Sequence, residues 1–159
     1  MLSADSELRD AVNAAAPKLL AMAESAAARS PAPGKWSPKQ IIGHLIDSAS
    51  NNHQRFVRAQ FTDELVFPGY AQDEWVAAGN YAAAPWSELV EFWRLYNLQI
   101  ARVMETASPA VRTKPRARHN LDEIASHAIP KDQATTLEYF MADYVWHLKH
   151  HLSQIFPTT

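Results

Sequence analysis

The chain has 159 residues, a formal net charge of -2 and 47% hydrophobic residues, and it contains no cysteine. The absence of cysteine excludes disulfides, Cys-ligated zinc, iron–sulfur clusters and a cysteine nucleophile. Any ligand cluster must therefore use His, Asp and Glu. The slight negative charge argues against a nucleic-acid partner, which usually meets a strongly basic surface.

Length and apolar content together predict one domain over residues 1-159. No apolar run approaches the roughly 20 residues that cross a bilayer, so we expect no membrane partner. The first residues, MLSADSELRD, lack the positive charge and apolar stretch of a secretory signal. We therefore expect a cytoplasmic protein.

The first expected helix covers residues 4–29, where apolar side chains recur three, four or seven positions apart. Pro17 lies inside it and predicts a kink or a short break, because proline lacks the backbone donor that a helix interior needs. The segment 30–34 contains two prolines and a glycine, and it should end the helix.

The second expected helix covers residues 38–61. Ser37 and Gln40 form a capping box, and Pro38 stands at the first helical position. His44 lies on the flank of the apolar stripe of this helix, so its side chain should point inward.

Residues 62–84 read as a long connection with turn signals, interrupted by a possible helical turn at 73–76. A connection of this length is often functional. A third helix is expected over residues 85–107, where large apolar residues follow helical spacing.

A second long connection covers residues 111–134, with a short helix expected near 122–127. Thr135 and Glu138 form a second capping box, which predicts a fourth helix over residues 136–156. No segment shows strand-like alternation. The sequence therefore predicts an all-α protein, a four-helix bundle with long connecting loops.

Two histidines on the fourth helix share a face with core side chains. His147 and His151 are four residues apart, in register with Phe140 and Tyr144. An i, i+4 histidine pair can present two nitrogens to one metal ion, and the inward His44 is the natural third ligand. Hydrogen bonds to neighbouring side chains would satisfy two buried histidines equally well, and spacing alone does not separate these interpretations.

Two carboxylates lie near these histidines along the chain. Asp47 follows His44 by three residues, and Asp143 precedes His147 by one turn. Either one could accept the second ring N–H of a ligating histidine and fix its tautomer. Each could instead cap a helix flank or pair with a nearby cation.

The other histidines fit the site less well. His150 should lie beside the site, since it is about 100° around the helix from His151. His53 is too far along its helix to share a metal with His44. His119 and His127 fall in a predicted loop and are most simply solvated. The basic run of the same loop is more simply a solvated segment than a carboxylate-recognition site; its members are Arg112, Lys114, Arg116 and Arg118.

Three segments together resemble the DinB/YfiT-like superfamily of metal-dependent four-helix bundles. Residues 36–48 resemble its W-(S/T)-x-x-(E/Q)-x-x-x-H-L-x-(D/H)-S element. Residues 143–155 resemble its C-terminal H-x-x-H-H-x-x-Q-I element, and residues 67–76 resemble a loop of one branch of the family. The three elements occur in the family's order over most of the chain.

The resemblance implies a site as well as a fold. The positions of the family's three metal ligands match His44, His147 and His151, and nickel or zinc is the usual ion. Family members resemble thiol S-transferases, which join bacillithiol, mycothiol or glutathione to an electrophile, or hydrolases. The implied function is a metal-dependent enzyme that activates a low-molecular-weight thiol or water toward a small-molecule substrate. The alternative is a non-catalytic bundle that binds a metal or a small ligand.

Two further expectations follow from the resemblance. Members often pair through helices, so a homodimer is expected. The long connections should shape the substrate pocket, with Tyr70, Trp75 and Arg116 as candidate lining residues. A role in DNA damage, which only the family name would imply, has no support in the charge pattern.

Overall fold

The computed structural model describes residues 3–157, and every regular element in this range is helical. Four long helices are α1 (Ala4–Leu20), α3 (Pro38–Arg58), α5 (Trp86–Thr106) and α8 (Leu137–Ile155). The short ones are α2 (Glu24–Ala27), α4 (Gln72–Gly79), the 3-10 helix η1 (Tyr81–Ala83), α6 (Pro109–Thr113) and α7 (Leu121–Ile124). The all-α expectation is confirmed.

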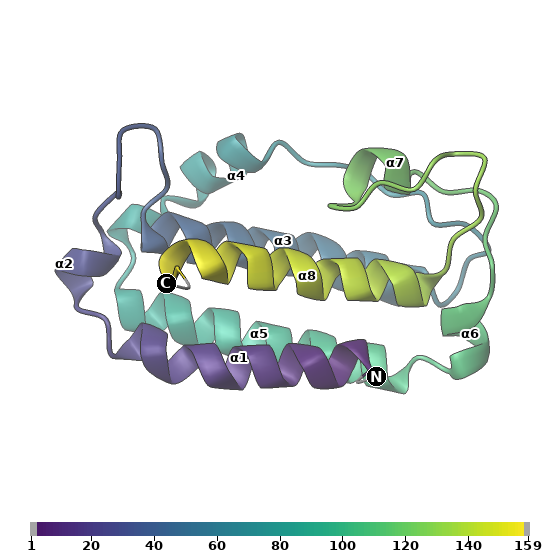
Figure 1. The fold of residues 1–159 in the computed structure, drawn as a ribbon, viewed down its shortest axis with the longest axis horizontal. Helices are drawn as coiled ribbons and strands as arrows, with labels where there is room; N and C mark the ends of the chain where they lie inside the picture. The colour runs from purple at the N-terminus through teal and green to yellow at the C-terminus, as the bar shows by residue number, and fades with distance from the viewer. Residues whose placement is uncertain (1–2, 158–159) are drawn as a thin grey trace.

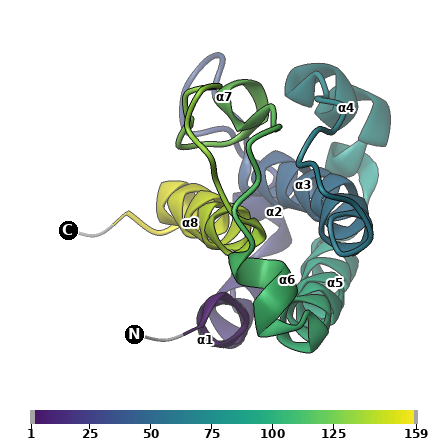
Figure 2. The same cartoon turned by 90° about the vertical axis from the view of Figure 1, so that its right-hand side faces the viewer.

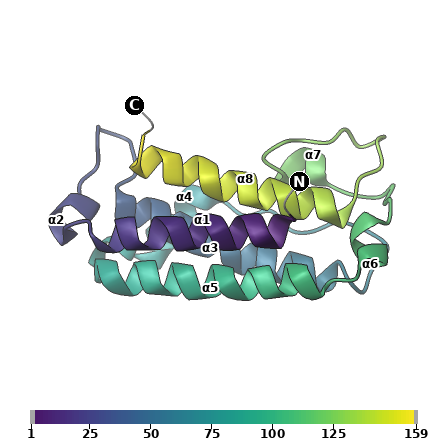
Figure 3. The same ribbon diagram turned by 60° about the horizontal axis from the view of Figure 1, so that its bottom comes forward.

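The four long helices form a bundle. Seen end-on in Figure 2, α1, α5, α3 and α8 stand at four corners in that order. Figure 3 shows α1 lying along α5. In Figure 1, α8 runs antiparallel beside α3. The beginning of α3 therefore lies next to the end of α8, which are the two segments that carry the predicted ligands.

Of the two capping signals in the sequence, one is observed where expected and the other is shifted by one residue. Both capping-box hydrogen bonds between Ser37 and Gln40 are present at the start of α3. Pro17 lies in the last turn of α1, and the expected break follows at residues 21–23, so α2 is a separate short helix. The predicted cap of α8 was one residue off, because the Thr136 hydroxyl accepts the Tyr139 N–H while Thr135 pairs its backbone with Arg116.

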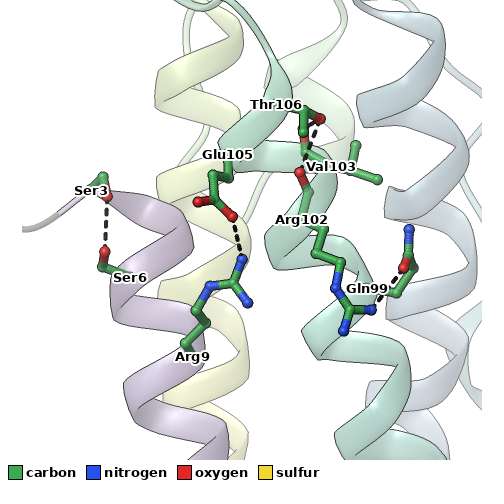
Figure 4. A network of polar contacts seen from close by, with 8 residues as sticks. All are labelled: Ser3, Ser6, Arg9, Gln99, Arg102, Val103, Glu105 and Thr106. Carbon is green, nitrogen blue, oxygen red and sulfur yellow. Dashed lines mark hydrogen bonds and ion pairs between the residues drawn. The ribbon is translucent and has the colours of Figure 1, made fainter.

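The core is formed by apolar faces of all four long helices. Its largest fully buried side chains include Phe56, Trp93 and Phe140. Burial of such side chains is the main driving force for folding. At the surface, an ion pair of 2.6 Å between Arg9 and Glu105 joins α1 to the end of α5, as Figure 4 shows. Such exposed pairs contribute about 0–1 kcal/mol each, so the core determines how α1 and α5 pack.

The two long connections lie side by side over the α3–α8 face. Leu65 donates its N–H to the Arg118 carbonyl and accepts one from the Asn120 N–H. The Asn120 side chain bonds both the N–H and the carbonyl of Phe67. In Figure 2, α4 and α7 stand on the outer side of α3 and α8. These contacts place both connections where they can border a site between the two helices.

Candidate metal centre

Three histidines meet between the start of α3 and the end of α8. His44 comes from α3, and His147 and His151 come from successive turns of α8. Each offers a nitrogen, and these nitrogens all lie within 4.8 Å of one another. The structure thus brings together the three residues that the sequence singled out as a group.

The spacing of one pair of ring nitrogens fits a shared ion. The Nε2 atoms of His44 and His147 are 3.2 Å apart. Two nitrogens bound at about 2.0–2.1 Å to one tetrahedral zinc ion are about 3.3 Å apart. A hydrogen bond between the two rings would also give this distance, but it would leave the third imidazole, from His151, facing the same point without a role. The donor set of three imidazoles suits zinc or nickel.

Burial keeps these histidines neutral. His44 is only 1% exposed. Burial, followed by the charge of His151, lowers its pKa to about 4. Burial is also the main cause that lowers the pKa of His147 to about 3, with contributions from the neighbouring histidines. The pKa of His151 is lowered for the same first reason. Metal binding requires neutral imidazole, so the site is ready for an ion at neutral pH.

Neighbouring side chains orient two of the rings. His151 Nδ1 lies 2.9 Å from Gln154 Oε1, so it donates to this oxygen and leaves Nε2 free as a ligand atom. The indole of Trp36 packs over His44, with ring centroids 4.9 Å apart, and lies 6.4 Å from the His151 ring. Trp36 thereby covers one side of the centre.

Asp47 contacts a tyrosine hydroxyl, which is none of the partners that the sequence left open. Its Oδ1 accepts a 2.5 Å hydrogen bond from the Tyr81 hydroxyl of η1, and its Oδ2 is buried with no partner among the described residues. Burial raises its pKa, against the effect of the Tyr81 hydrogen bond. Nδ1 of His44 likewise has no partner in the described part of the chain. Asp47 therefore ties η1 to α3 rather than orienting a ligand.

The Tyr81 ring reaches Asp47 across two glycines. A methyl group added at Gly43 would come within 2.0 Å of the Tyr81 ring, and one added at Gly79 within 2.4 Å. Gly43 precedes His44 directly, so the absence of a side chain there lets η1 approach α3 beside the centre.

Asp143 also has partners other than a ligating ring. Its two oxygens accept the backbone N–H groups of Ser126 and His127 at 2.8 Å each, and Oδ1 lies 3.0 Å from His127 Nδ1. Nδ1 of His147 is buried without a partner among the described residues. Asp143 thus holds the connection after α7 against α8 instead of orienting His147.

The remaining histidines lie outside the cluster. His150 stacks on Trp146 beside the site, as expected, and His53 contacts the Tyr96 hydroxyl. His127 is exposed. The expectation of a solvated His119 was wrong: the residue is 6% exposed, because Nε2 bonds the Gln133 carbonyl and Nδ1 accepts the Leu121 N–H.

The basic run is solvated at Lys114 and Arg118, as expected, but not at Arg116. Lys114 and Arg118 pair with Asp63 and Glu64, at 2.5 and 2.7 Å. Arg116 is buried and donates to the Val111 carbonyl. Arg116 does not line the cavity beside His147, because its buried side chain is directed to the Val111 carbonyl.

A cavity of about 290 Å³ extends from the centre between α3, α8 and the two long connections. This volume is close to the lower end of the about 300–1,000 Å³ range of small-molecule sites. Tyr70 lines the cavity as predicted, and His147 is the triad member that borders it. Trp75 does not line it and instead packs against the Tyr70 ring at 5.2 Å. A candidate metal centre therefore opens onto a ligand-sized space.

The sequence interpretation missed several residues at or near the centre. Gln154 and Trp36 stood within the quoted motifs but were given no role. The spacing of Gln154, one turn after His151, was the available signal. Nothing in the local sequence marked Tyr81, whose contact depends on a fold across 34 residues.

Residues 7–155 match the family model of the DinB superfamily. The chain belongs to the DinB superfamily. None of its described helices is long and apolar enough to cross a membrane.

The chain is also similar to a curated protein and to a solved structure. A protein of Bacillus mycoides (strain KBAB4), named "Putative metal-dependent hydrolase", is 23% identical over 122 residues, or 77% of this chain. The match covers 64% of that relative, which is less than two thirds of its length. The structure of YfiT from Bacillus subtilis, described as a probable metal-dependent hydrolase with an unusual four-helix bundle topology, matches with a TM-score of 0.77. At 18% identity, over 96% of this chain and 82% of YfiT, it confirms the four-helix bundle.

Proposed function

We propose that this DinB-superfamily chain is a metal-dependent hydrolase whose single divalent ion, zinc or nickel, is held by His44, His147 and His151. The convergence of three neutral imidazoles beside a ligand-sized cavity carries the proposal. The names of the two similar proteins support the same class of reaction. The substrate is a small molecule that occupies the cavity.

The chain's own residues supply binding, orientation and exclusion of water. When bound, a divalent ion supplies Lewis acidity, which polarises a carbonyl and lowers the pKa of water. Gln154 holds the His151 ring with Nε2 toward the shared point, and Trp36 shields that ring and His44. The side of the centre that His147 borders stays open to the cavity.

A low-molecular-weight thiol is the alternative nucleophile at the same site. The chain has no cysteine of its own, so a thiol would have to enter as a cosubstrate. The same three histidines would serve either reaction, and the two differ only in what attacks.

The test compares reactions side by side in protein reconstituted with zinc or with nickel. Ester and amide substrates report hydrolysis, and a panel of thiols with a reactive electrophile reports transfer. We expect hydrolysis that His147→Ala abolishes and that His53→Ala, the matched control on the other ligand-bearing helix, leaves unchanged. Equal rates in wild type and His147→Ala would contradict an enzymatic role and favour a binding module. Activity that appears only with a thiol would replace hydrolysis by transfer.

A further inference from the structure

A buried arginine lines the cavity away from the histidines. Arg55 is only 5% exposed and lies on the last turn of α3. Together with Ser48 and Asn52, it forms a polar row along the side of the cavity that α3 provides. The row continues the face of α3 on which His44 stands.

Arg55 has no acidic partner within residues 3–157. Its recorded hydrogen bonds go to the Asn52 side-chain oxygen at 3.3 Å and the Pro68 carbonyl at 2.7 Å. These bonds use two of its five N–H donors. A buried cation is costly unless it is paired. The cavity is therefore where a compensating negative charge would lie.

Neighbouring groups fix the guanidinium in place. Its central carbon lies 5.9 Å from the centroid of the Tyr70 ring and 6.0 Å from that of Phe140. Both rings line the cavity, and cation–π contacts at this distance restrict the planar group. The anion-binding fork is thus preorganised before any ligand arrives.

The two acids on the cavity wall already have partners. Asp143 is bonded by two backbone N–H groups and His127, and Glu123 pairs with Lys131. A single unpaired positive charge beside two carboxylates matches a monoanion better than a dianionic phosphate, which the acids would repel. A carboxylate also accepts the parallel N–H pair of a guanidinium.

We propose that Arg55 is the anion-binding end of this cavity and that the substrate carries a carboxylate which the guanidinium receives. This assignment of substrate class rests on the proposed function, because it takes the cavity beside His147 as the substrate site. Arg55 follows His44 by 11 positions, or about 16 Å along the helix. Its side chain leans back toward Asn52, so the carboxylate would lie roughly 10 Å from the histidines.

Two matched probes test this arrangement in zinc-loaded protein. Adipic acid monohydroxamate and hexanohydroxamic acid have the same length and metal-binding head, but only the first ends in a carboxylate. Titration calorimetry should show roughly tenfold or tighter binding of the first in wild type. Arg55→Met should remove this advantage. Arg58→Met, an exposed arginine on the same helix that does not line this cavity, should retain it.

Metal-free protein tests the anion site at Arg55 independently of the ion. Hexanoate should bind more tightly than hexanamide, and Arg55→Met should abolish the difference. If hydroxamates fail to bind zinc-loaded protein while hexanoate still depends on Arg55, the metal proposal fails and the anion site stands. If both hydroxamates bind equally well in wild type, the anion site is wrong and the metal proposal stands.

A purely structural role of Arg55 predicts a different pattern. If the residue only anchors Pro68, Arg55→Met should weaken both hydroxamates to the same extent, which would overturn the proposal. Should that variant not fold, Arg55→Gln keeps an N–H donor for the Pro68 carbonyl and removes the charge. We expect Arg55→Gln to lose the carboxylate advantage while its unfolding by urea remains cooperative.

Discussion

Acidification should destabilise the metal-free protein through its buried histidines. His44 and His147 have folded-state pKa values of about 4 and about 3, whereas an unfolded histidine has a pKa of about 6.5. The unfolded chain therefore binds more protons below pH 6.5, and stability falls as pH decreases. The loss ends where the folded histidines themselves become protonated, near pH 3–4.

The size of this effect follows from the two shifts. At pH 5 both rings are neutral in the folded chain and protonated in the unfolded chain. Each then lowers the free energy of unfolding by about 2 kcal/mol relative to pH 8. The pair should account for about 4 kcal/mol, and His151, whose pKa is shifted in the same direction, adds to it.

Urea unfolding between pH 5 and pH 8, with a chelator present, measures this loss. His44→Gln and His147→Gln should each reduce the pH-dependent loss by about 2 kcal/mol. His53→Gln removes a histidine from α3 outside the cluster and serves as the matched control. A double variant, His44→Gln with His147→Gln, whose stability falls with acid as steeply as that of wild type would refute the buried neutral pair.

Three further variants test the surroundings of the centre. Gly43→Ala should destabilise the protein by about 1–3 kcal/mol in urea unfolding, because its methyl group would overlap the Tyr81 ring. The same substitution in a Tyr81→Ala background should show no such cost, and a cost that adds to that of Tyr81→Ala would contradict the contact. Gln154→Ala should weaken zinc binding by about 10–100-fold in a competition titration, because the His151 ring loses the acceptor that orients it. An unchanged affinity would show that Gln154 does not orient His151 for metal binding. Asp143→Asn should cost about 1–3 kcal/mol and speed proteolysis between α7 and α8, because the amide has one acceptor oxygen and one of the two backbone N–H groups of Ser126 and His127 loses its partner. Unchanged proteolysis would show that the connection is held by other contacts.

The bundle and the histidine cluster were predictable because both depend on short-range patterns. Apolar spacing and the Ser37 capping box located α3, and the four-residue interval placed His147 and His151 on one face. The inward direction of His44 then followed from its position beside the apolar stripe of α3. Only the antiparallel contact between α3 and α8, which brings His44 to the other two histidines, could not be read from local patterns.

The supporting contacts could not be predicted, because they join segments that are distant in sequence. The partner of Asp47 is Tyr81, and the partners of Asp143 lie in the connection before α8. His119 was expected in solvent because nothing local shows that the two connections pair. Thr135 and Thr136 are equally suitable caps by residue type, and the backbone pairing of Thr135 with Arg116 decides between them.

Metal stoichiometry tests the central claim most directly. Protein purified without a histidine tag is reconstituted with zinc or nickel, freed of excess ion and analysed for metal content. One ion per chain is expected, with loss in His44→Ala, His147→Ala and His151→Ala and retention in His150→Ala, the neighbour outside the cluster. A content well below one ion per chain, or one that His44→Ala leaves unchanged, would contradict the proposed metal centre.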